Sequence, residues 1–180
     1  EGKPVSVGQI AAKLHLSHGA TAAALGKLRN IEFDQDGNIV GAGITLNPTP
    51  HRFQVNGRML FTWCAMDTLI FPPILNQTAH VVSTCPATGV TIRLTVTPGG
   101  VEDLDLASAA VSLPKLSEAG CDVRPDFCNH SHFFSSADAA SAWLSEHPGA
   151  TLLSIEDARR MGGVLAEFLF RSDSEAGRDP

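Results

Sequence analysis

A cysteine and an aspartate lie three residues apart in the segment Trp63-Cys64-Ala65-Met66-Asp67. Residues at this spacing on a helix share a face, so the Cys64 thiol and the Asp67 carboxylate can meet. The carboxylate can then accept the thiol's proton and deliver it elsewhere. The resulting thiolate is both a nucleophile and a metal ligand. The alternative is a buried cysteine that packs as a small hydrophobic residue, with Asp67 at the solvent edge.

A second cysteine, Cys128, lies in the segment Phe-Cys-Asn-His-Ser-His-Phe-Phe of residues 127–134. In a strand, alternation would place Cys128, His130 and His132 on one face. One cysteine and two histidines can bind zinc, and a ligand from the first segment could complete a tetrahedral set. The spacing matches no standard zinc motif, however, and the edge of a core strand would show the same alternation. Zinc therefore remains an alternative.

The other two cysteines have no acid–base partner nearby in the sequence. Cys85 lies in a turn before Pro86, which favours a structural role, and Cys121 lies in a loop where we expect it to be exposed and incidental. Four cysteines in 180 residues are few for a disulfide scaffold. We expect a reducing, cytoplasmic setting in which thiols persist.

The composition excludes several classes of protein. The chain is 43% hydrophobic and 18% charged, which suits a packed core rather than a disordered segment. Its net charge of −6 argues against a nucleic-acid-binding face or a polybasic membrane surface. No apolar run approaches the roughly 18 residues that span a bilayer. We expect neither a nucleic-acid nor a membrane partner.

Residues 1–47 predict a winged-helix-like structural module. Ser6 and Gln9 have the spacing of a capping box that opens one helix, and Ser17 begins a second. Residues 31–46 then alternate on both sides of an Asp-Gly-Asn turn, which is typical of a β-hairpin. Helix, helix and hairpin together outline a winged helix. The module has few basic residues, so we interpret it as structural rather than DNA-binding.

The sequence Asn-Pro-Thr-Pro at residues 47–50 predicts a linker, and residues 51–171 predict the catalytic domain. A hairpin is expected around Asn56-Gly57, followed by a helix from Trp63 to Ile70 that Pro72-Pro73 stops. Further strands are predicted at 79–83, 90–97, 109–113, 130–134 and 152–155, and further helices at 136–146 and from Ser154 to Phe170. Residues 172–180 are expected to be a disordered tail. The predicted fold class is α+β, with the winged-helix-like unit followed by a mixed, mainly antiparallel sheet flanked by helices.

Taken together, the cysteine segments resemble those of the organomercurial lyases, also called alkylmercury lyases. The matching blocks are residues 63–72, 85–89 and 127–134, each with a cysteine at the expected place, and the resemblance continues upstream through residues 33–39. It covers almost the whole chain. The family usually has further helical residues before the two-helix unit, so we expect a shortened form here.

The resemblance implies that Cys64, Asp67 and Cys128 are catalytic. The family splits the carbon–mercury bond of alkyl and aryl mercurials by protonolysis, giving a hydrocarbon and Hg(II) in mercury detoxification. Cys64 and Cys128 would bind the mercury, and Asp67 would carry the proton and complete the Hg(II) site. Cys85 matches a structural cysteine, and Asn129 stands where some members carry a second, adjacent cysteine. The resemblance implies no cofactor. It does imply two kinds of partner, which are small cellular thiols and a mercuric reductase that accepts Hg(II).

Proteins of other classes could use the same residues. A metal-responsive regulator would bind DNA through the winged helix and sense metal through the cysteines. A metal-binding or zinc-stabilised domain would hold its metal permanently. Release of hydrocarbon from a mercurial would indicate the lyase, whereas tight binding without product and salt-dependent DNA retention would indicate the regulator.

Overall fold

The computed structural model describes residues 2–115 and 123–164, and β-strands form the framework of this part. The larger sheet contains β1 (Glu32–Phe33), β2 (Ile39–Ala42), β3 (Ile44–Thr45), β4 (His51–Val55), β5 (Arg58–Thr62), β6 (Ala79–Thr84), β7 (Thr91–Val96) and β8 (Val101–Glu102). Their order in the sheet is β1-β2-β3-β5-β4-β6-β7-β8. The smaller sheet contains β9 (Ala110–Leu113), β10 (Phe133–Phe134) and β11 (Thr151–Ser154) in the order β10-β9-β11. All of these pairings are antiparallel, whereas a mixed, mainly antiparallel sheet was predicted.

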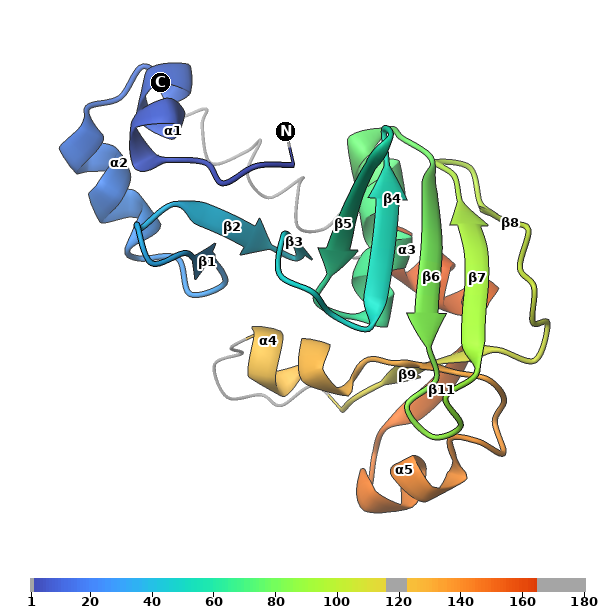
Figure 1. Cartoon of the computed structure of the whole chain (residues 1–180). Coiled ribbons are helices and arrows are strands. Elements are labelled where there is room, and N and C mark those ends of the chain that lie inside the picture. Colours follow the sequence, from blue (N-terminus) through green and yellow to red (C-terminus); the bar gives the residue numbers. More distant parts are fainter. Residues whose placement is uncertain (1, 116–122, 165–180) are drawn as a thin grey trace, which may run out of the picture.

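The helices surround this framework (Figure 1). They are α1 (Val7–Leu14), α2 (His18–Leu25), α3 (Ala65–Leu75), α4 (Val123–Asp126), the 3-10 helix η1 (Cys128–His130), α5 (Ser141–Glu146) and a helix over 155–164. In Figure 1, α1 and α2 lie beyond the β1 end of the larger sheet, and α3 lies behind β4, β5 and β6. The α+β class is thus confirmed. No helix among the described residues is both long enough and apolar enough to cross a bilayer.

Three of the predicted helix starts, at Ser6, Ser17 and Ser154, are confirmed. Ser6 and Gln9 form both hydrogen bonds of the capping box at α1, and the Ser17 side chain accepts a hydrogen bond from the Ala20 N–H at α2. Ser154 likewise accepts from the Asp157 N–H at the start of the last helix. The predicted end of that helix, the tail at 172–180 and Cys121 all lie outside the described residues.

The N-terminal hairpin continues into the rest of the sheet. Strands β1 and β2 pair as predicted, and β3 then pairs with β5, which places Ile44 opposite Thr62. One sheet therefore runs from the N-terminal module to the strand that leads to Cys64. The winged-helix interpretation and the domain boundary at residues 47–51 stay predictions.

Helix α3 differs from its prediction at both ends. It begins at Ala65 rather than Trp63, and it continues through Pro72 and Pro73 to Leu75. A proline inside a helix removes a backbone hydrogen bond and costs about 3 kcal/mol. Burial of the helix against the sheet, where Pro72 itself is buried, offsets this cost. Asn76 caps the helix with a left-handed backbone (φ 50°), and its N–H donates to the carbonyls of both prolines.

The predicted strand 130–134 and helix 136–146 are both shorter than expected. Residues 128–130 form η1, because the side chain of Ser112 in β9 binds the His130 carbonyl and the His132 N–H and draws the chain into a turn. Only Phe133 and Phe134 extend, and both are buried in the core. Turns occupy 137–140, so α5 begins at Ser141.

Candidate active site

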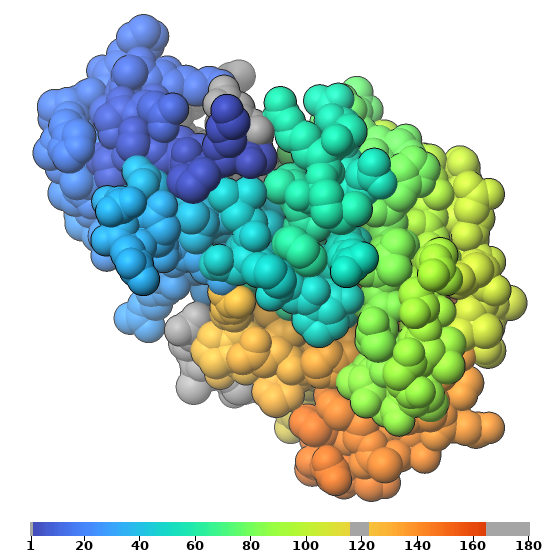
Figure 2. Space-filling view, viewed as in Figure 1, coloured from blue at the N-terminus to red at the C-terminus, as the bar shows by residue number. Residues whose placement is uncertain are grey.

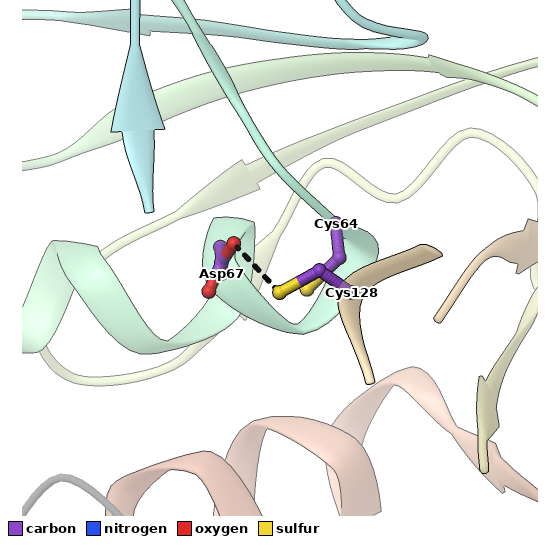
Figure 3. A group of neighbouring side chains, drawn as sticks. All are labelled: Cys64, Asp67 and Cys128. Atoms are coloured by element: carbon purple, nitrogen blue, oxygen red, sulfur yellow. Dashed lines mark hydrogen bonds between the residues drawn. The ribbon is translucent and has the colours of Figure 1, made fainter. Parts of the chain in front are cut away.

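Three potential metal ligands from distant parts of the chain meet beside the start of α3. One ligand atom each from Cys64, Asp67 and Cys128 lie within 4.8 Å of one another. The Cys128 Sγ lies 4.0 Å from the Asp67 Oδ2, across a sequence separation of 61 residues. Figure 3 shows the two sulfur atoms side by side and the carboxylate facing them. All three predicted site residues are therefore brought together.

Cys64 is the N-cap of α3, and Asp67 lies in the first turn. The backbone of Cys64 is extended (φ −149°), so the two residues do not share a helix face as the spacing predicted. They meet because the side chains of an N-cap and the third helical residue both reach the open end of the helix. The N–H groups at this end of the helix carry partial positive charge, which stabilises a thiolate or a carboxylate placed beside them.

Ser131 fixes the place of Cys128 relative to this helix. Its carbonyl accepts a hydrogen bond from the Ala65 N–H (3.1 Å), and its hydroxyl accepts one from the Met66 N–H (3.4 Å). The side chain is fully buried. Sequence reasoning missed this residue, because nothing in a serine between two histidines indicates that it satisfies the amides of a helix 65 residues away.

Burial controls the protonation of the site. Cys64 is 0% exposed and Cys128 is 2% exposed. Burial raises the pKa of Asp67 to about 7, against hydrogen bonds from Cys64 that lower it. Burial also raises the pKa of the Cys64 thiol well above its usual value, helped by the neighbouring Cys128 thiol and the Asp67 charge. At neutral pH the Cys64 thiol therefore keeps its proton, while Asp67 is poised to accept or donate one.

One guanidinium connects the segments that carry the two cysteines. The Arg124 side chain, in α4, lies over the ring of Trp63, with 4.9 Å between its central carbon and the ring centroid. Trp63 is the neighbour of Cys64, and Arg124 precedes Cys128 by one helical turn. The same guanidinium forms an ion pair with Glu32 of β1. Neither of these two contacts had a signal in the sequence.

The zinc set of Cys128, His130 and His132 is wrong for the described part of the chain. There, the group whose ligand atoms converge is Cys64, Asp67 and Cys128, and neither histidine belongs to it. The turn of η1 breaks the strand alternation on which the prediction depended. The imidazole of His130 instead lies 5.3 Å from that of His147, and His132 meets Trp143 edge-on at 6.2 Å.

The arrangement suits chemistry on a soft metal. In the described structure, Cys64, Cys85 and Cys128 are all free thiols. Thiolates bind soft metals in preference to hard ones. Two of them beside a carboxyl group that exchanges its proton near neutral pH can hold a metal and protonate a group bound to it.

Comparisons with known proteins agree with this site. The family model described as MerB, alkylmercury lyase, matches residues 44–167. An alkylmercury lyase of Streptomyces lividans is 46% identical over 177 residues, which cover 98% of this chain and 82% of that protein. One of Pseudomonas putida is 45% identical over 174 residues, covering 97% and 81%. One of Staphylococcus epidermidis is 44% identical over 165 residues, covering 92% and 76%.

A solved structure has the same fold. It is the crystal structure of the mercury-bound form of MerB2, with a TM-score of 0.81 and 28% sequence identity. The match covers 93% of this chain and 84% of that one. With the family model and the three relatives, it leads to one conclusion: the chain belongs to the alkylmercury lyase family.

Proposed function

We propose that the chain cleaves the carbon–mercury bond of alkyl and aryl mercurials by protonolysis, releasing a hydrocarbon and Hg(II). The observation that carries this proposal is the convergence of two buried thiols and a carboxyl group within 4.8 Å. Membership of the family supports the same activity. The alternative of a metal-responsive regulator is not favoured, because the relatives that match are alkylmercury lyases.

The first step attaches the substrate, written R–Hg–X, to one sulfur. A thiol of Cys64 or Cys128 forms a sulfur–mercury bond, and its proton leaves with X as HX. The second thiol then gives its proton to the Asp67 carboxylate. The thiolate so formed adds to the same mercury atom.

The second step breaks the bond to carbon. The added thiolate donates electron density to mercury and weakens the carbon–mercury bond, and the carbon takes the proton from the Asp67 carboxyl. R–Hg–X and two thiols thus yield R–H, HX and Hg(II) held by two thiolates, and Asp67 is again ionised. Mercury neither gains nor loses electrons in this scheme.

Turnover requires that Hg(II) leave the two cysteines. Small cellular thiols in excess can displace it by ligand exchange, and mercuric reductase is the acceptor that we propose. The ligands and the proton in the scheme come from the three side chains, so the scheme needs no organic cofactor.

A product assay tests the proposal directly. The protein is incubated with phenylmercury and excess small thiol, and benzene is measured by gas chromatography. We expect benzene in proportion to the enzyme and to time, above the level given by the thiol alone. Tight binding of phenylmercury without benzene would contradict the proposal and favour a metal-binding module.

The pKa of Asp67 predicts the pH dependence of the reaction. Below about pH 7 the carboxyl is protonated and cannot accept the thiol proton. We expect kcat/KM to rise about tenfold per pH unit below that pKa and to level off above it. The measurement is the rate of benzene release across this range, and a rate that falls as the pH rises through 7 would oppose the assigned role.

Cys85 is expected to act in stability alone. It is 1% exposed and belongs to the hydrophobic core, outside the ligand group. Cys85→Ala removes a buried sulfur and should lower the free energy of unfolding by about 1 kcal/mol. Urea unfolding measures this change, and benzene release at a temperature where the variant is folded should match that of the wild type.

A further inference from the structure

Helix α4 depends on other parts of the protein for its position. It has four residues, and none of its side chains is buried. A helix this short gains little from its own hydrogen bonds. Its residue Arg124 meets both Glu32 and Trp63, so this side chain anchors the start of the segment that carries Cys128. In Figure 2 this segment, coloured yellow to orange, borders the cyan strands of the larger sheet.

The carboxylate of Glu32 is held in place by its own strand neighbours. Its Oε2 accepts hydrogen bonds from the Thr45 hydroxyl and, at 3.3 Å, from the Asn47 side-chain amide. A side chain at Gly41 would collide with Glu32 and Thr45, so the glycine leaves room for this carboxylate. The Glu32 side chain is only 13% exposed. Glu32 therefore presents a preorganised negative charge to Arg124.

These contacts link the N-terminal hairpin to the two segments that carry Cys64 and Cys128. Glu32 pairs with Arg124, whose guanidinium lies on Trp63, next to Cys64. Arg124 also fixes the helical turn before Cys128. A change in the position of this one guanidinium is therefore expected to alter the position of Cys128 relative to Cys64.

We propose that Glu32 is a positioning residue for the lyase reaction, which acts through Arg124 to hold Cys128 beside Cys64. This is the contribution of the N-terminal hairpin to catalysis, and it rests on the proposed function. Capture of the mercurial by one sulfur does not require the second, whereas bond cleavage does. Loss of the Glu32 charge should therefore lower kcat more than it changes KM.

A double-mutant cycle tests whether Glu32 acts through Arg124. The substitution Glu32→Gln keeps the size of the side chain and its acceptor for Thr45, and we expect about a tenfold loss of kcat with phenylmercury. Arg124→Met should lose at least as much, and the double variant should lose no more than Arg124→Met, since the partner is already gone. Asp105→Asn is the matched control: it removes the exposed ion pair of Arg93 and Asp105 and should keep the wild-type kcat.

A second measurement does not depend on turnover. Hg(II) held by two thiolates absorbs in the ultraviolet, so titration with Hg(II) against a competing thiol reports how well both sulfurs reach one ion. We expect weaker Hg(II) binding by Glu32→Gln and unchanged binding by Asp105→Asn. Absence of benzene from the wild type would defeat the proposed function, while this titration would still test the positioning role.

The proposal fails if Glu32→Gln has the wild-type kcat and Hg(II) affinity, or if the losses in the double variant multiply. Thermal unfolding of each variant is followed by circular dichroism, and the activity assays are run at a temperature at which every variant is folded. Arg124→Lys is a milder variant that keeps the charge on α4, and it should lose less activity than Arg124→Met. Equal losses in these two variants would overturn the role of the ion pair.

Discussion

Cys64→Ser and Cys128→Ser should each abolish the release of benzene from phenylmercury. A hydroxyl group is a hard, weakly acidic ligand that does not replace a thiolate on a soft metal. Loss of either member of the pair should lower kcat/KM by more than about 10³-fold, the scale found when one part of a catalytic unit is removed. Because the two sulfurs act on one mercury atom, the double variant should be no worse than either single variant.

Cys121→Ser is the matched control for these variants, because the sequence gives that cysteine no partner. It should release benzene at a rate near that of the wild type. Product is measured by gas chromatography with excess thiol present. Normal protonolysis by Cys128→Ser would refute the scheme in which two thiolates bind the mercury.

Asp67→Asn should still bind the mercurial but release hydrocarbon about 10²- to 10⁴-fold more slowly, the usual contribution of a general acid or base. The amide keeps the shape of the side chain but cannot carry the proton from sulfur to carbon. Single-turnover experiments separate the two steps, since mercurial binding is followed by loss of free thiol and cleavage by benzene. An unchanged cleavage rate would remove Asp67 from the mechanism.

Asp67→Asn should also change the pH dependence of the free energy of unfolding, because the pKa of Asp67 is raised in the folded protein. In the wild type, burial disfavours the ionised carboxyl, so folding is more favourable while the group is protonated. This stability is lost as the pH rises from the unfolded-state value of 3.8 to about 7. Asp67→Asn has no such loss, so its free energy of unfolding relative to wild type should increase over this interval in urea titrations.

Local signals in the sequence predicted the parts of the fold that depend on local interactions. The capping box at Ser6 and the cap at Ser17 need only neighbouring residues, and the structure confirms both. The predicted end of α3, before Pro72, was wrong. Burial of the helix against the sheet outweighs the cost of placing Pro72 and Pro73 inside it. Such an outcome depends on tertiary packing, which the residues near the prolines do not reveal.

In the candidate site, too, the sequence predicted local relations but not the contacts between distant segments. The spacing of Cys64 and Asp67 predicted their meeting, although by a helix face rather than by the open end of a helix. From the residues alone, Cys128 was compatible with a zinc set or with the edge of a core strand, and only the family resemblance placed it with Cys64 and Asp67 in a catalytic site. The ion pair of Glu32 and Arg124 links two segments with no shared pattern, so only the folded structure reveals it.

The hydrogen bonds of Ser131 have a consequence for chain length. Because Ser131 is tied to the first amides of α3, the backbone between it and Cys128 sets how far the second sulfur lies from the carboxylate. Residues 128–130 form the 3-10 helix η1, in which one inserted residue adds a rise of about 2 Å and rotates the chain by about a third of a turn. This change is large compared with the separation of 4.0 Å between the Cys128 sulfur and Asp67. We therefore expect insertions and deletions between Cys128 and Ser131 to be as damaging as those between Cys64 and Asp67, because both intervals set the geometry of the site.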